Sequence, residues 1–320
     1  MNIDRLSGLL EEAAARGITR LGAGATHPTW LQGTEYERGL SIVVTAPEDI
    51  KQRLEEFILG EPTLDLFNSK MFNTGFGCTR VEANTLMRWL LYSTSENGVE
   101  KTISTLTSFL AAKGTPGLEV LAISGIEVEQ PIELSGGIRL IPFSALPTSH
   151  VKFTLAPPAL NSRELEQVGI LPPLFRYRRS GIEPTSALVR DTEIYPKAQR
   201  PEDQYAYPQM TDDLREACEC LTLVFGCTPL PNAHWMEVAS WVPCAGWLGS
   251  GWSDPIHDVI NPTTCKLSVE QGKEALAVHT SFMRLPRDVR KKLRVPIQRL
   301  NQARRRQQSA DKAIDLGIAM

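Results

Sequence analysis

The sequence contains no run of about 20 apolar residues, the length that a membrane-spanning helix requires. Its first residues, MNIDRLSGLLEEAAARG, also lack the basic start and the long apolar core of a signal peptide. We therefore expect no membrane partner and a cytoplasmic location.

Cysteine is sparse, with six in 320 residues, as is typical of free thiols in a reducing compartment. A helical pattern places Cys218 on the same apolar face as Leu214 and Leu221, which predicts a core thiol. The alternative is a zinc site built from these side chains: Cys218, Cys220, Cys227, His234, Cys244 and His257. Because a lone Cys-x-Cys does not match the paired spacing of zinc knuckles, we predict no metal.

Cofactor and catalytic motifs are missing as well. The glycines of LGAGATH and GWLGSGW fit neither a dinucleotide loop nor a phosphate loop, so we predict no cofactor. His257 and Asp258 are the residue types of a catalytic base and the partner that orients it. Together with the neighbouring tryptophan- and glycine-rich segment, this pair makes a small-molecule enzyme one alternative function. The sequence nevertheless assigns no catalytic residue.

What the chain does contain is a succession of helices and strands. Apolar spacing predicts helices near residues 1–17, 47–60, 81–93 and 97–114, and strands near 40–45 and 118–128. Gly136-Gly137 predicts the tight turn of a hairpin. This order favours an α+β region with a mixed or antiparallel sheet, followed by a C-terminal helical hairpin.

Composition divides the chain into four segments. We expect an α/β or α+β domain over residues 1–154, a proline-rich connecting and strand region over 155–210, a mixed helical and tryptophan-rich segment over 211–283, and a basic helical hairpin over 284–320. The second segment includes a short basic loop, FRYRRS.

The net charge of −3 conceals a basic C-terminal end. Between Arg284 and Lys312, eleven Lys and Arg stand against two Asp, a local charge of +9 that leaves −12 for the rest. Such a segment contacts an anionic partner, docks on the acidic body, or is a solvated helix face.

Two helices are predicted in this basic end. A narrow apolar stripe runs from Leu285 to Leu300, and Pro296 within it predicts a bend or break. Ser309 is a good N-cap for a final helix whose apolar positions include Ile314 and Ile318.

The string RLNQARRRQQSADKAIDLGIAM resembles the start of an Apea-like HEPN domain, with Asp311 to Ala319 matching the second helix of that pattern and Met320 at a Leu position. The resemblance covers about the last 35 residues and implies the start of an incomplete helical bundle. It further implies RNA binding or RNA cleavage in defence or stress response, and a homodimer through the C-terminal helices. The nucleic-acid-binding candidates are Lys291, Lys292, Arg294, Arg299, Arg304, Arg305 and Arg306.

In that family the chemistry belongs to an Arg-x4–6-His motif on a later helix, where Arg stabilises phosphate charge and His moves the proton of a hydroxyl. Arg20 and His27 have this spacing, but they lie in a Gly- and Pro-flanked turn. We therefore expect a truncated domain without its catalytic helix, and no ribonuclease activity from this chain. The alternative is a ligand- or partner-binding sensor module without catalysis.

Overall fold

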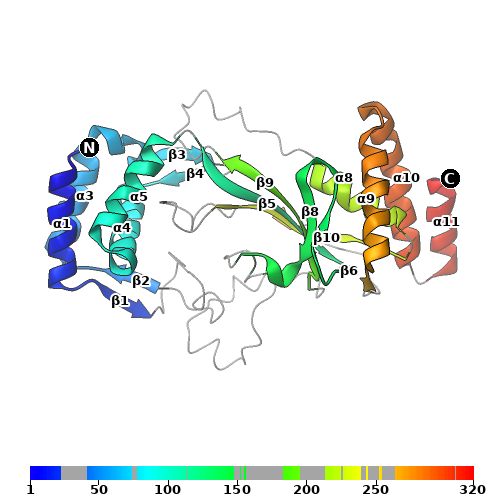
Figure 1. Ribbon diagram of the computed structural model, residues 1–320, viewed down its shortest axis with the longest axis horizontal. Helices are drawn as coiled ribbons and strands as arrows, with labels where there is room; N and C mark the ends of the chain where they lie inside the picture. Colours follow the sequence, from blue (N-terminus) through cyan, green and yellow to red (C-terminus); the bar gives the residue numbers. More distant parts are fainter. Residues whose placement is uncertain are drawn as a thin grey trace.

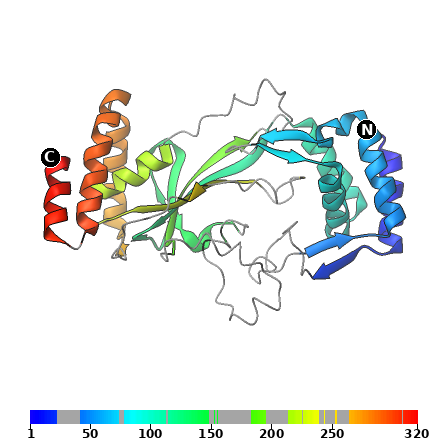
Figure 2. The same cartoon turned by 180° about the vertical axis from the view of Figure 1, so that it is seen from behind.

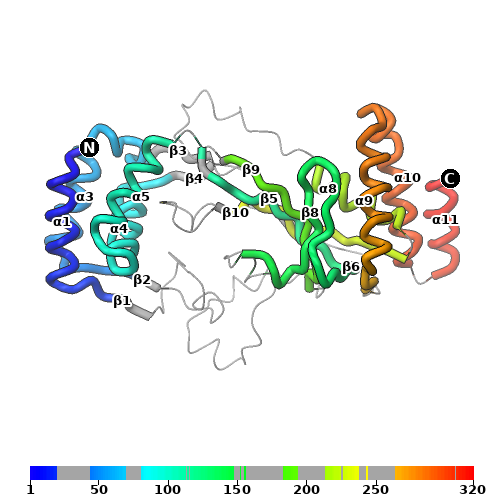
Figure 3. The backbone as a smooth tube through the Cα atoms, in the orientation of Figure 1, coloured from blue at the N-terminus to red at the C-terminus, as the bar shows by residue number. Residues whose placement is uncertain are grey.

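The computed structural model describes residues 1–22, 42–73, 78–112, 114–147, 183–194, 213–224, 226–238, 252–253, 264–306 and 308–320, with the single residues 152, 155 and 243. Figure 1 shows helices at the N-terminal end, a twisted sheet in the middle and further helices at the C-terminal end. The two chain ends lie at opposite ends of the molecule (Figure 3). The fold is thus mixed α+β with an antiparallel sheet.

Four helices enclose the first hydrophobic core: α1 (Ile3–Arg16), α3 (Glu48–Gly60), α4 (Ala83–Asn97) and α5 (Val99–Ala111). The predicted N-terminal helix is confirmed as α1, and its Leu6, Leu9 and Leu10 are almost fully buried. Asn2 caps this helix by accepting a hydrogen bond from the backbone of Arg5.

Two antiparallel strand pairs and a 3-10 turn accompany these helices: β1 (Thr19–Gly22) with β2 (Ile42–Thr45), β3 (Lys70–Asn73) with β4 (Cys78–Val81), and η1 (Pro62–Phe67). The predicted strand near residues 40–45 is therefore confirmed as β2.

The central sheet has six strands, all paired antiparallel, in the order β11-β10-β5-β9-β8-β7. Their bounds are β5 (Thr115–Ser124), β7 (Ile132–Glu133), β8 (Ile138–Pro142), β9 (Ser186–Ile194), β10 (Leu230–Val238) and β11 (Trp252–Ser253). A second pair, β6 (Ile126–Glu127) and β12 (Cys265–Lys266), is parallel.

The predicted glycine turn joins β7 to β8. Gly136 and Gly137 have φ angles of +75° and +72° in the short turn η2 (Ser135–Gly137), a conformation that favours glycine.

The two faces of the sheet contribute to separate cores because side chains alternate along a strand. Val120 and Ala122 of β5 join one core with Trp235 of β10 and Phe143 of η3 (Phe143–Ala145). Leu121 and Ile123 of the same strand join the other core, which is covered by α8 (Asp213–Cys220), η6 (Leu221–Leu223) and α9 (Val269–Met283). Figure 2 shows α8 crossing between the sheet and the C-terminal helices.

The C-terminal helices are α9, α10 (Arg287–Arg305) and α11 (Ser309–Ala319). A capping box between Ser268 and Gln271 fixes the start of α9. The expected break at Pro296 is absent, because α10 continues through this residue. The N-cap of α11 is Gln308 instead of Ser309, which is the first helical residue.

Candidate functional site

The first half of α10 docks on the acidic helix α8. Arg290 forms an ion pair with Glu216, and Arg294 Nε lies 3.1 Å from Glu219 Oε1. Gln298 donates to the same Glu219 oxygen at 2.6 Å. Burial is the main cause that raises the pKa of Glu219, and the neighbouring cation and amide oppose this shift.

The second half of α10 holds the loop that precedes β10. Asn301 Nδ2 donates to the carbonyl of Pro229 at 2.7 Å, and Arg304 donates to the carbonyls of Thr222 and Cys227. Arg305 is half-buried and donates to the carbonyl of Asn301 at 3.3 Å. Burial lowers the pKa of the Arg305 guanidinium.

The last helix, α11, is attached to α10 through Asp315, which is 3% exposed. Its carboxylate accepts from Arg299 at 3.0 Å and from Arg306 at 3.2 Å. The apolar side chains of α11 instead face outward, since Ile314 is 62% and Ile318 is 49% exposed. Polar contacts with α10 therefore orient this helix.

These contacts divide the predicted nucleic-acid-binding candidates into two groups. Arg294, Arg299 and Arg306 form internal ion pairs, and Arg304 and Arg305 bond to backbone carbonyls. Lys291 and Lys292 are exposed. Two further exposed cations are not among these candidates: Arg284, at the C-terminal end of α9, and Arg287, the first residue of α10.

We name Arg284, Arg287, Lys291 and Lys292 together the cationic corner, at the junction of α9 and α10. Within the part of the chain that the structure describes, none of the four makes an ion pair or a side-chain hydrogen bond. Asp288 is the only acidic residue between positions 284 and 295. The corner is therefore a surface of concentrated positive charge.

A second polar group lies inside the molecule, between the sheet and the start of α8. Glu119 of β5 is 1% exposed and accepts from His234 Nε2 of β10 at 3.0 Å. Its other oxygen binds Arg190 of β9 at 2.5 Å, and Arg190 also pairs with Asp213 at 2.7 Å. These four residues join three strands and one helix, but Glu119 and His234 are too deeply buried to meet a substrate.

The Ser135–His279 pair is likewise internal. Ser135 donates both its hydroxyl, at 2.8 Å, and its backbone N–H, at 3.2 Å, to His279 Nδ1. The other ring nitrogen is buried and has no hydrogen-bond partner among the described residues, so no carboxylate orients the ring as in a catalytic triad. His279 is therefore a hydrogen-bonded core residue.

The structure describes most of the cysteine and histidine residues that were considered above for a zinc site. Cys218 and Cys220 are buried, and burial raises the pKa of the Cys220 thiol to about 12. Over the described residues, no three His, Cys, Asp or Glu side chains gather in a group that would hold a metal ion. Cys244 and His257 lie outside the described residues.

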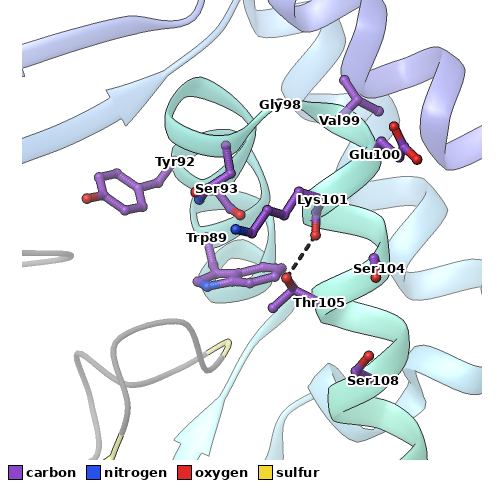
Figure 4. Close-up of a pocket in the computed structure, with 11 residues that line it drawn as sticks. Trp89, Tyr92, Ser93, Gly98, Val99, Glu100, Lys101, Ser104, Thr105 and Ser108 are labelled. Carbon is purple, nitrogen blue, oxygen red and sulfur yellow. Dashed lines mark hydrogen bonds between the residues drawn. The ribbon is translucent and has the colours of Figure 1, made fainter.

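A groove of about 940 Å³ lies between α4 and α5 (Figure 4). Its lining combines Trp89 and Tyr92 with hydroxyl side chains of Ser93, Ser104 and Thr105. Lys101 extends along this surface toward the indole ring in Figure 4. The groove thus offers the cation of Lys101, the carboxylate of Glu100, several hydroxyls and two aromatic side chains.

Several predicted features lie outside the described residues: the basic loop around Tyr177, His27 of the Arg20–His27 spacing, His257–Asp258, and Trp247. Among the helices of the described ranges, none combines the length and the apolar character needed to cross a bilayer.

Comparisons of the chain with protein-family models, with curated proteins and with solved structures each found no match.

Proposed function

We propose that this protein binds RNA through the cationic corner. The observation that carries the proposal is the contrast along α10: the arginines that face α8 and α11 are neutralised internally, whereas Arg284, Arg287, Lys291 and Lys292 are left to solvent. Lys and Arg contacts to phosphates supply most of the affinity of sequence-independent nucleic-acid binding.

We propose further that the protein is of the Apea-like HEPN class and acts in defence or stress response. In support, α11 is part of the C-terminal string that resembles this family, and it exposes Ile314, Leu316 and Ile318. Such side chains favour burial against further helices, either of a bundle or of a second copy in a homodimer.

The binding test uses the full chain and a 5′-labelled single-stranded RNA, followed by fluorescence anisotropy at low salt. Exchanging both lysines of the corner (Lys291→Gln with Lys292→Gln) removes two phosphate partners, and we expect the affinity to fall by about tenfold or more. The RNA should stay intact. Wild-type affinity in this variant, or no binding by the wild type at low salt, contradicts the proposal.

A matched control comes from the N-terminal helices. Lys51→Gln with Arg53→Gln removes the same charge from α3, where both cations already pair with Glu48 and Glu12. We expect this variant to bind RNA as the wild type does. An equal loss in both variants would indicate attraction by overall charge, not by the corner.

The groove between α4 and α5 favours a second candidate, the ligand-binding module. Lys101 and the hydroxyls of Ser104 and Thr105 suit a polyhydroxylated anion, such as a sugar phosphate. A panel of sugar phosphates would then raise the melting temperature of the wild type and leave that of Lys101→Ala unchanged. The absence of any shift across the panel would remove this candidate.

A further inference from the structure

Two cysteines that are far apart in the sequence face each other beside the loop that α10 holds. Cys227 Sγ lies 3.8 Å from Cys265 Sγ, although the two residues are 38 positions apart. Cys227 precedes β10 and is fully buried, while Cys265 begins β12 and is half-buried. Both are free thiols.

Both backbones are fixed by hydrogen bonds. Cys227 N–H donates to the carbonyl of Val224 at 3.2 Å, and Cys265 N–H donates to the carbonyl of Gly125 at 3.1 Å. A disulfide has an S–S bond of about 2.05 Å, so the two sulfur atoms must approach by less than about 2 Å, a movement within reach of side-chain rotation.

From this pairing we propose that Cys227 and Cys265 are an oxidative modification site, which reacts with a peroxide to form a reversible disulfide. The first step is attack of the Cys265 thiolate on a peroxide oxygen. The O–O bond breaks, hydroxide leaves and takes up a proton, and Cys265 becomes a sulfenic acid.

In the second step Cys227 sulfur attacks the sulfenic sulfur and loses its proton. The S–O bond breaks, and the departing hydroxide leaves with that proton as water. Two thiols and one hydrogen peroxide thus give one disulfide and two waters, with two electrons passing from the sulfurs to the peroxide.

The surroundings assign a different role to each thiol. Cys265 is the more accessible and is the one that peroxide reaches. Burial raises the pKa of Cys227 to about 12, so this residue is a neutral thiol at pH 7 and serves as the resolving partner.

The disulfide would fix the loop on which α10 docks. The carbonyl of Cys227 accepts from Arg304 at 3.2 Å, and the carbonyl of Pro229 accepts from Asn301 at 2.7 Å. Tying Cys227 to β12 would add a second, covalent attachment to this loop. A cross-link across this span restricts the unfolded chain, and we expect the oxidised protein to melt about 5 °C higher. This inference does not depend on RNA binding.

The experiment treats the full reduced chain with one equivalent of hydrogen peroxide, blocks remaining thiols, and maps peptides by mass spectrometry without reduction. We expect a peptide pair joined through Cys227 and Cys265, released by dithiothreitol, together with the rise in melting temperature. Cys265→Ser should lose both effects. Cys220→Ser removes a buried thiol elsewhere and should keep both.

Three outcomes would overturn the proposal. One is over-oxidation of Cys265 to the sulfinic acid without a cross-link. Another is a disulfide of either thiol with a different cysteine. The third is an oxidation-dependent stabilisation that persists in Cys265→Ser. The cross-link map of the wild type decides the matter even where a variant fails to fold.

Discussion

Arg294 on α10 and Glu219 on α8 form an ion pair with a 3.1 Å separation between Nε and Oε1, and both side chains are more than two-thirds buried. With the adjacent Arg290–Glu216 pair, this contact shows that part of the basic C-terminal segment docks on the acidic body of the same chain. Of the alternatives that the charge distribution allows, docking on the acidic body therefore applies to these arginines. Contact with an anionic partner is the alternative that concerns the cationic corner.

Replacing Glu219 by Gln removes the charge opposite the largely buried guanidinium of Arg294 and weakens the docking of α10 on α8. We expect the free energy of unfolding to fall by about 1–2 kcal/mol in urea titrations. Glu127→Gln is the control, because the Glu127–Lys266 contact is longer, at 3.5 Å, and exposed. Equal stability of the two variants would mean that the docking contact contributes nothing.

Asp315→Asn should release α11 from α10. The carboxylate holds Arg299 and Arg306, and a helix of about 12 residues is marginally stable in water without such contacts. Hydrogen exchange over residues 309–319 should accelerate while α10 keeps its protection. Asp311→Asn, in the first turn of the same helix, is the control and should exchange more slowly than Asp315→Asn.

Glu119→Gln tests the buried polar group. Glu119 binds His234 and Arg190 within the sheet, and Glu119→Gln removes a buried carboxylate from the partly buried Arg190, which keeps its ion pair with Asp213. Because hydrogen bonds to charged groups contribute more than neutral ones, we expect a loss of about 1–3 kcal/mol of folding free energy. A loss no larger than that of Glu127→Gln would show that this group does not support the sheet.

His279 should make stability depend on pH. Burial lowers the pKa of His279 below 6.5, so between the folded and unfolded pKa values the unfolded chain binds more protons. The contribution of neutral His279 to the free energy of unfolding is then fully present above pH 6.5 and decreases as the pH falls below it. Urea midpoints at pH 7.5 and 5.5 should differ less in His279→Gln than in the wild type, and an equal difference would contradict this assignment.

Local patterns predicted the elements whose determinants are close together in the sequence. The helical spacing of apolar residues predicted α3, which buries Ile50, Leu54 and Phe57, and Gly136-Gly137 predicted the β7–β8 turn. Cys218 is buried as predicted, because its neighbours at helical spacing are apolar.

The polar cluster around Glu119 was not predictable in this way. Glu119 and His234 are 115 positions apart, and only the pairing of β10 with β5 brings them together. Similarly, the apolar pattern of α11 gave no indication that Asp315 would be its buried residue. That burial follows from two arginines on the preceding helix, whose side-chain directions the spacing alone does not determine.

The salt dependence of RNA binding tests the central claim most directly. If all four cations of the corner contact phosphates of single-stranded RNA, a plot of log affinity against log salt has a slope of about −3. The variant with Arg284, Arg287, Lys291 and Lys292 all changed to Gln should show a slope near zero with little residual binding. An identical slope and affinity in the variant and the wild type would contradict the assignment of RNA binding to this surface.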